Sequence, residues 1–218
     1  MHKICIIDCG IGNLRSVQRA FERVGENAQI TGDPENLKNA SSFVLPGVGA
    51  FPDAMKNLKR KGLDLIITQN VIEKKKPILG ICLGMQLLAQ NSCENGLHTG
   101  LGIVPGKVVL LEVKGQKNWL GHKLTLPHVG WNQVKSRKKL KLFKNIPDNS
   151  DFYFVHSFHF QCKTTDYIAA TTTHGISFIS ALEHENVFAT QFHPEKSQRL
   201  GHQLIKNFVN YCYGDHQN

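Results

Sequence analysis

The stretch PILGICLGMQLLAQ, residues 77–90, decides the fold that we predict for this chain. Residues 77–81 are apolar enough to form a buried strand, and residues 83–90 carry the apolar side chains of a helix. Cys82 lies between them, with a glycine two positions to either side. Because glycine adds no side chain, this spacing permits a sharp turn that holds the central residue away from the sheet. The stretch therefore predicts a strand, a tight turn and a helix.

The rest of the first half repeats this alternation of short apolar runs and amphipathic stretches. We expect strands at residues 3–8 and 42–45, the second stopped by Pro46 and Gly47, and two helices with the apolar faces Val17, Ala20, Phe21, Val24 and Phe51, Ala54, Met55, Leu58. Strands that alternate with helices favour a parallel sheet covered by helices.

The second half is rich in β-branched and aromatic residues separated by short polar gaps, which favours strands and hairpins. The expected strands lie at residues 103–113, 122–134, 152–160, 167–173 and 177–190, and a final helix at residues 198–212. No linker or internal repeat divides the sequence. We therefore expect one domain over residues 1–218, of the α/β class, with a central mostly parallel sheet flanked by helices and an antiparallel extension.

The composition is that of a folded globular protein, because 41% of the residues are hydrophobic and 20% are charged. No apolar run approaches the ~20 residues that cross a bilayer, and the first residues lack the features of a signal peptide. The 6 cysteines include no Cys-x-x-Cys pair, which favours free thiols over a zinc site or a disulfide framework. We therefore expect a cytoplasmic protein with no metal and no cofactor.

The formal net charge of +9 leaves a nucleic-acid partner open. The positive residues concentrate in two short runs, Lys74–Lys76 and Arg137–Lys141. Neither run contains the interleaved aromatic residues on which single-stranded nucleic acid stacks. A solvated surface is the simpler interpretation, and binding that weakens steeply with salt would favour the alternative.

Cys82 is the first candidate for chemistry. At a helix N-terminus, free N–H groups and the helix dipole favour the reactive thiolate over the thiol. A buried cysteine that fills a glycine-flanked turn is the alternative. The segment QFHPE, residues 191–195, offers a base, His193, and an orienting carboxylate, Glu195. We expect extended chain here, since a residue before proline avoids helical geometry, and alternation would then place both side chains on one side.

An acyl-transfer site also needs donors for an oxyanion. The backbone N–H of Leu83 follows the candidate nucleophile directly, and PGVGAF at residues 46–51 follows a predicted strand. Its glycines allow a main-chain N–H to approach a substrate closely, although an ordinary strand-to-helix turn would also explain them.

These segments together carry a resemblance. GICLGMQ around Cys82, PGVGAF, and QFHPEKS at residues 191–197 resemble class I glutamine amidotransferases, whose nucleophile, base and orienting residue follow in this order. More narrowly, IIDCGIGNLRSV at residues 6–17, PHVGWN at residues 127–132 and FYFVHS at residues 152–157 are similar to segments of the glutaminase subunits of imidazole glycerol phosphate synthases, enzymes of histidine biosynthesis. The resemblance covers nearly the whole chain.

The resemblance implies a flavodoxin-like fold and hydrolysis of glutamine to glutamate and ammonia. Cys82 would attack the side-chain amide, His193 would transfer the proton, and Glu195 would hold His193 in the right tautomer. The residues that would bind the substrate or its oxyanion are Gly47, Val48, Gly49, Leu83, Gln86, Ser157 and Phe158.

The resemblance also implies a partner, a (β/α)₈ barrel cyclase subunit that forms a heterodimer with the glutaminase and receives its ammonia through a channel. The barrel would make imidazole glycerol phosphate and aminoimidazole carboxamide ribotide. Asn13, Trp131, Asn132 and Lys196 match family positions near the active site or this interface, although each could be an ordinary turn, packing or surface residue.

Departures from the family pattern keep alternatives open. Position 158 is Phe where the family commonly has Tyr, and residues 111–126 form a longer stretch than in many relatives. Such an insertion could belong to a sister group that supplies ammonia for amidation of bacterial surface sugars. The candidate catalytic residues would also suit a stand-alone cysteine hydrolase. Residues 10–15 resemble half of a dinucleotide-binding fingerprint, but Arg15 replaces its third glycine.

Overall fold

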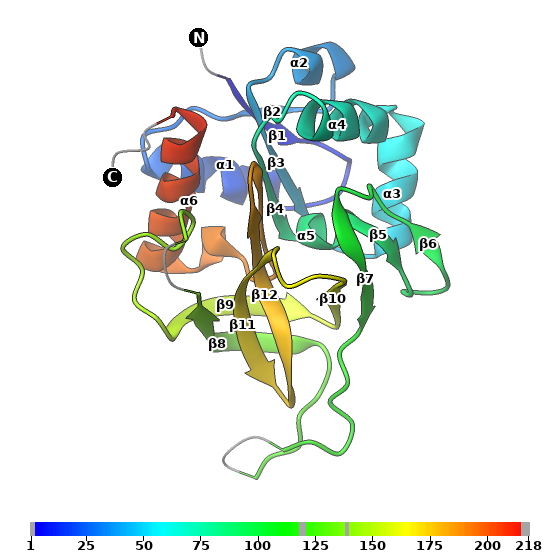
Figure 1. Ribbon diagram of the computed structural model, residues 1–218, viewed down its shortest axis with the longest axis vertical. Coiled ribbons are helices and arrows are strands. Elements are labelled where there is room, and N and C mark those ends of the chain that lie inside the picture. Colours follow the sequence, from blue (N-terminus) through cyan, green and yellow to red (C-terminus); the bar gives the residue numbers. More distant parts are fainter. Residues whose placement is uncertain (1–2, 118–120, 138–139, 215–218) are drawn as a thin grey trace.

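The computed structural model describes residues 3–117, 121–137 and 140–214 (Figure 1). The strands are β1 Ile4–Ile7, β2 Gln29–Thr31, β3 Ser42–Gly47, β4 Ile78–Cys82, β5 Ala89–Ser92, β6 His98–Thr99, β7 Val104–Leu110, β8 His128–Ser136, β9 Ser150–His156, β10 Phe158–Cys162, β11 Ile168–His174, β12 Ile176–His184 and β13 Val187–Thr190. The helices are α1 Leu14–Arg23, α2 Pro34–Lys38, α3 Phe51–Arg60, α4 Leu63–Ile72, α5 Leu83–Leu87 and α6 Gln198–Cys212, with a 3-10 turn at Pro194–Lys196. Within the described residues, none of these helices has both the length and the apolarity to cross a bilayer.

A parallel sheet lies at the centre of the fold. Its strands follow the order β2-β1-β3-β4-β13, and each pairs in parallel with its neighbours. All residues of β1, β3 and β4 are buried, which explains why these strands are continuous apolar runs. The carboxyl ends of β3, β4 and β13 lie side by side, so the loops that follow them meet at one edge of the sheet.

Helices cover both faces of this parallel sheet (Figure 1). Successive side chains of β1 point to opposite faces, and they belong to different apolar clusters. Ile4 and Ile6 pack with α1 and α6, whereas Cys5 and Ile7 pack in the cluster that contains α3, α4 and α5. A mostly parallel sheet between two helical layers confirms the predicted fold class.

β12 joins the parallel sheet to an antiparallel extension. On one edge it pairs with β13 and, further along, with β10, and on the other edge it pairs with β11. The extension forks there: β10 leads to β7, β5 and β6, while β11 leads to β8 and β9 (Figure 1). β9 returns to the carboxyl end of β4, where Val155 O lies 3.8 Å from Cys82 Sγ.

Several predicted boundaries are wrong for local reasons. β3 continues through Pro46 instead of stopping before it. β1 pairs with β3 only as far as Val44, so Pro46 has a neighbouring strand, β4, on one side only, and a proline is tolerated there. The helix predicted over residues 83–90 ends at Leu87, since the chain from Ala89 onward pairs with β7.

In the second half, the predicted strand at residues 122–134 begins only at His128. Residues 152–160 and 177–190 each contain parts of two strands, divided at Ser157 and after His184. The sequence analysis did not include β2, α2 or α4. Residues 118–120 of the longer stretch 111–126 lie outside the described residues.

Candidate active site

Cys82 occupies a strained turn between β4 and α5. Its φ of 55° and ψ of −108° are a combination that residues with a side chain rarely adopt. Two glycines make this turn possible. A Cβ on Gly84 would lie 1.6 Å from the backbone oxygen of Leu45, and a Cβ on Gly80 would lie 2.9 Å from the backbone oxygen of Gly84. The predicted strand, tight turn and helix are therefore confirmed.

A cavity of about 430 Å³ opens beside Cys82. The loop after β3, the β4–α5 turn and the β9–β10 junction provide most of its lining, and the residues after β5, before β8 and in the 3-10 turn provide the rest. The lining residues are Val48, Gly49, Cys82, Leu83, Gln86, Glu94, Pro127, Val155, His156, Ser157, Phe158 and Lys196. Of the predicted substrate-binding residues, only Gly47 is outside this lining. Gly47 is buried against the side chain of Leu83.

His193 and Glu195 form a buried pair. His193 Nδ1 and Glu195 Oε1 are 2.7 Å apart, and the two side chains are 3% and 2% exposed. The two side chains meet as the sequence predicts, but the predicted reason is wrong. Only His193 is extended, and Pro194–Lys196 forms a 3-10 turn that folds the carboxylate back onto the ring.

β9 and α6 hold this turn in place. His193 N donates to Tyr153 O at 2.9 Å, while Ser197 Oγ accepts from Tyr153 N at 3.0 Å and donates to His193 O at 2.7 Å. Gly201 of α6 approaches so closely that a Cβ there would lie 1.9 Å from Pro194 O. The sequence analysis missed both supports, although a glycine inside an apolar helix is a signal of close packing.

The pKa of His193 is raised to about 10. Burial acts to lower it, but the side chains of Cys82 and Glu195 act in the opposite direction and prevail. His193 Nε2 forms no hydrogen bond to any described residue, so the effect of Cys82 on the pKa of His193 is electrostatic. The Cys82 side chain therefore has a protonated imidazole as its neighbour.

Two glutamine side chains connect the sulfur to the far side of the cavity. Gln191 is completely buried, and its Nε2 lies 3.8 Å from Cys82 Sγ. Its Oε1 accepts from Gln86 Nε2 at 3.1 Å, and the same nitrogen donates to Phe158 O at 2.9 Å. The sequence analysis identified Gln86 and Phe158 but missed the linking residue Gln191.

Among the described residues that line the cavity, Glu94 is the one with a carboxylate. Its Oε2 accepts from the backbone N–H of Phe51 at 2.9 Å, which fixes the carboxylate at the start of α3. The sequence analysis also missed this residue, since it lies in no motif. A fixed carboxylate here can receive a positively charged group of a ligand.

The four predicted interface residues lie in different places. Lys196 lines the cavity, and its Nζ is 5.6 Å from the centroid of the Tyr153 ring. Trp131 is 49% exposed on β8, and its neighbour Asn132 is hydrogen-bonded to His128. Asn13 is not in this cavity; it caps α1 by accepting from the N–H of Ser16.

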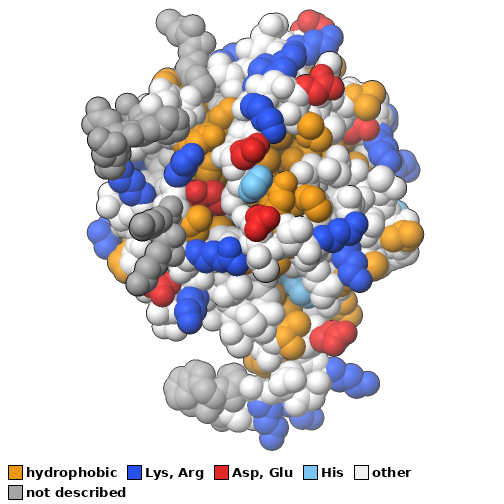
Figure 2. Space-filling view, viewed as in Figure 1, with side chains coloured by type: hydrophobic (Ala, Val, Ile, Leu, Met, Phe, Trp, Pro, Cys, Tyr) orange, Lys and Arg blue, Asp and Glu red, His pale blue; other side chains and the backbone are white. Residues whose placement is uncertain are grey.

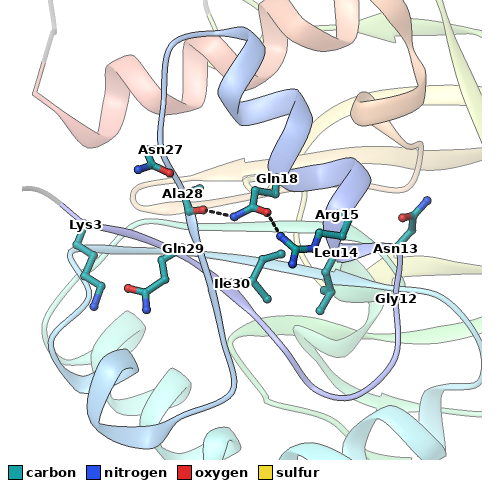
Figure 3. Close-up of a pocket in the computed structure, with 10 residues that line it drawn as sticks. All are labelled: Lys3, Gly12, Asn13, Leu14, Arg15, Gln18, Asn27, Ala28, Gln29 and Ile30. Atoms are coloured by element: carbon teal, nitrogen blue, oxygen red, sulfur yellow. Dashed lines mark hydrogen bonds between the residues drawn. The ribbon is translucent and has the colours of Figure 1, made fainter.

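A separate pocket of about 780 Å³ contains Asn13 and runs along the start of α1 and β2 (Figure 3). Three residues of this pocket are joined by hydrogen bonds. Arg15 donates to Gln18 Oε1 at 2.9 Å, and Gln18 Nε2 donates to Ala28 O at 3.0 Å. Arg15, which replaces the third glycine of the dinucleotide fingerprint, is thus held by Gln18 of the same helix.

Basic and acidic side chains are interspersed over the face shown in Figure 2. Lys38 pairs with Glu35 at 2.6 Å, and Lys75 pairs with Glu185 at 2.9 Å. Residues 138–139 of the predicted basic run lie outside the described residues. For the run that includes Lys75, this arrangement favours a solvated surface.

Comparisons with known proteins identify the family of the chain. Residues 5–212 match the family Glutamine amidotransferase class-I. The chain is 45% identical over 206 residues to imidazole glycerol phosphate synthase subunit HisH 1 of Campylobacter jejuni, with 94% of this chain and 98% of the relative covered. It is 47% identical over 208 residues to subunit HisH of Geobacter sulfurreducens, with 95% and 98% covered.

Solved structures share the fold at low sequence identity. A glutamine amidotransferase has a TM-score of 0.73 at 18% identity, with 96% of this chain and 98% of that chain covered. PurLQS from Thermotoga maritima has a TM-score of 0.70 at 18% identity, with the same coverage. The flavodoxin-like fold of class I amidotransferases is therefore confirmed. The chain belongs to the class I glutamine amidotransferases and, among them, to the HisH subunits of imidazole glycerol phosphate synthase.

Proposed function

We propose that this HisH subunit hydrolyses glutamine in the Cys82 cavity, with Cys82 as the nucleophile, His193 as the base and Glu195 as the orienting carboxylate. One observation carries the proposal. Cys82 lines the cavity from a strained turn, and the imidazole of His193 is its electrostatic neighbour. This imidazole is hydrogen-bonded to the buried carboxylate of Glu195. This is the set of groups that an activated thiol nucleophile needs.

In the first half-reaction, the Cys82 thiolate attacks the side-chain amide carbon of glutamine. The carbonyl electron pair moves onto oxygen, where the N–H groups of Leu83 and Gly49 stabilise the charge. Leu83 suits this role as the first residue of α5, and Gly49 as a lining residue without a side chain. The electron pair then returns and expels the nitrogen, which takes a proton from His193 and leaves as ammonia. A γ-glutamyl thioester remains.

In the second half-reaction, water attacks the thioester carbon. His193 accepts a proton from this water, and the tetrahedral intermediate releases the Cys82 thiolate and glutamate. Glu195 stabilises the imidazolium, which gives up a proton in the first half-reaction and forms again in the second, and it fixes the other proton on Nδ1, so that Nε2 serves the departing ammonia and the water.

The opposite side of the cavity binds the amino-acid end of glutamine. Glu94 provides a negative charge for the α-ammonium group, and Gln86 together with the backbone of Ser157 and Phe158 provides hydrogen-bonding groups. This arrangement places the amide carbon toward Cys82.

We also propose that a (β/α)₈ barrel cyclase subunit covers the mouth of this cavity as the partner in a heterodimer. Ammonia released into neutral water is mostly protonated and is then no nucleophile, so direct transfer has a clear advantage. Val129 and Trp131 support a docking surface, because these apolar side chains are 57% and 49% exposed on β8. Pro127, just before this strand, lines the cavity itself.

Glutamate release from glutamine tests the function, measured for the purified chain alone and with the barrel subunit from the same organism. We expect slow turnover alone and at least about a tenfold rise in the complex, which corresponds to a coupling free energy in the usual allosteric range. Equal turnover alone and in the complex would indicate a stand-alone hydrolase. Activation only by a sugar-amidating partner would assign the chain to that pathway instead.

A further inference from the structure

A chain of hydrogen bonds joins the outer strand β8 to the glutamine side of the cavity. Asn132 Nδ2 lies 3.2 Å from His128 Nε2, His128 Nδ1 lies 3.0 Å from His156 Nε2, and His156 Nδ1 lies 2.8 Å from Phe158 O. The two histidines are directly opposite each other on β8 and β9. They are 4% and 6% exposed, so water does not compete for these bonds.

The two ends of this chain fix the position of every proton. Phe158 O can only accept, so His156 Nδ1 carries a hydrogen and its Nε2 is the acceptor. His128 Nδ1 must then donate to it, which leaves His128 Nε2 to accept from the Asn132 amide. A neutral imidazole has one donor and one acceptor, and both rings satisfy this condition.

Asn132 is itself fixed in the donating orientation. Its Nδ2 also donates to Thr173 O at 2.9 Å, and its Oδ1 accepts from the N–H of Gln133 at 2.8 Å. The amide nitrogen therefore faces two acceptors, and a flipped amide would lose all three bonds.

Both imidazoles are neutral in the folded protein. Burial lowers the pKa of His128 to about 3 and that of His156 to about 4, and neighbouring histidines contribute in the same direction. One of these neighbours is His174, whose ring stacks on that of His128 with the ring centroids 4.0 Å apart. His159 and His193 lower the pKa of His156. No group of three or more His, Cys, Asp or Glu side chains in the described ranges could hold a metal ion. The pair therefore serves neither as a proton donor nor as a metal site.

The chain ends at an atom that also controls a lining residue. Phe158 O accepts from Gln86 Nε2 at 2.9 Å, and the second hydrogen of this nitrogen goes to Gln191 Oε1 at 3.1 Å. With both hydrogens used, the polar atom that Gln86 can offer to a ligand is Oε1.

We propose that His128 and His156 are positioning residues, which hold the Phe158 carbonyl and through it the Gln86 amide in the orientation that binds the amino-acid end of glutamine. This inference rests on the proposed function of the cavity. It assigns a role to two histidines that make no contact with the reacting amide.

Two substitutions at His156 separate this role from simple packing. In His156→Asn, the amide nitrogen takes the place of Nδ1 and can still donate to Phe158 O. In His156→Gln, the amide takes the place of Nε2, so His128 keeps a partner but Phe158 O loses its donor. Loss of one such bond is worth a factor of roughly ten in affinity.

We therefore expect His156→Gln to raise KM for glutamine about tenfold and to change kcat less than about threefold. His156→Asn should restore KM to within about threefold of the wild-type value. His184→Gln is the matched control, because His184 lies on β12 against Tyr167 and outside the cavity lining. Equal KM values for the two His156 variants, or a loss in kcat alone, would overturn the proposal.

Nitrogen-15 NMR of the wild-type chain gives a second test that depends on neither activity nor the folding of a variant. We expect both rings to be neutral at pH 6 with the proton on Nδ1. A proton on Nε2 of either ring, or a charged ring at this pH, would overturn the proposal. If the wild-type protein does not hydrolyse glutamine, the proposed function fails, and this spectrum still reports separately on the hydrogen-bond chain.

Discussion

His193 and His156 are buried beside the same cavity, yet their pKa values move in opposite directions. Burial acts to lower both values. At His193 the side chains of Cys82 and Glu195 reverse the effect and raise the pKa to about 10. At His156 the bond to the Phe158 carbonyl only partly offsets burial, and the pKa falls to about 4. Ionisable partners, rather than depth, decide whether a buried imidazole carries a proton or keeps a fixed neutral form.

The two histidines also come from different parts of the fold. His193 follows β13, the last strand of the parallel sheet, whereas His156 ends β9 in the antiparallel extension. The parallel sheet thus presents the groups proposed for bond breaking, and the extension presents the histidine pair and the Phe158 carbonyl that are proposed to orient Gln86. Substitutions on the two sides should therefore fail in different ways.

Cys82→Ala should have the largest effect. Without the thiol, glutamate release should fall by at least about 10⁴-fold, while the fold and partner binding persist. The pKa of His193 should also fall, because one of the two groups that raise it is gone. Cys93→Ala, at an exposed thiol outside the cavity lining, is the control and should retain activity. Full turnover by clean Cys82→Ala protein would reject the mechanism.

His193→Gln should reduce kcat by roughly 10³-fold, in the range observed for loss of a general base. KM for glutamine should change little, since the ring acts on the amide and not on the amino-acid end. Steady-state kinetics check this split against His98→Gln, a control at a histidine outside the cavity lining. A change confined to KM would contradict the assigned roles of the two sides.

Glu195→Gln should cost less, roughly 10- to 100-fold in kcat, because an amide can still bond to the ring but carries no charge. The pKa of His193 should fall, so the alkaline limb of the pH–rate profile should move to lower pH. An unchanged alkaline limb would show that the carboxylate does not set the protonation of His193.

The smallest effect concerns stability and pH. His156 has a folded-state pKa below its ordinary value of about 6.5, so the unfolded chain binds the proton more readily. The associated stability is present above about pH 6.5 and is lost as the pH falls toward 4. Urea unfolding at pH 7 and pH 5 should show a loss of stability that is smaller in His156→Asn by on the order of 1–2 kcal/mol, because His128 still contributes to the loss in both proteins. Equal losses in both proteins would indicate that His156 is not neutral in the folded state.

For His193 the sign is opposite. Its folded-state pKa is raised, so its contribution to stability is complete below about pH 6.5 and declines as the pH rises toward 10. The two histidines therefore limit stability at opposite ends of the pH range.

The turn at Cys82 could be predicted because its determinants are local. Two glycines and an apolar run lie within a few residues of the cysteine, and the structure requires each of them. The His193–Glu195 contact was also accessible from spacing. The 3-10 turn that makes it, however, depends on Ser197, which bonds to β9, and on Gly201 of α6, which packs against Pro194.

The histidine pair, the division between β9 and β10, and the position of Glu94 could not be predicted, because they depend on contacts between distant parts of the chain. His128 and His156 are 28 positions apart and meet only through the register of β8 with β9. The division between β9 and β10 at Ser157 likewise reflects the partners of each strand, β8 and β7. Glu94 is placed by its bond to Phe51, 43 positions away.

A glutamine analogue with an electrophilic carbon in place of the side-chain amide tests the central claim most directly. The chain would be incubated with this compound, digested, and mapped by mass spectrometry. We predict one covalent adduct, on Cys82, that glutamine prevents and that does not form in His193→Gln at neutral pH. An adduct on Cys93, or full inactivation with Cys82 unmodified, would contradict the claim that Cys82 is the nucleophile.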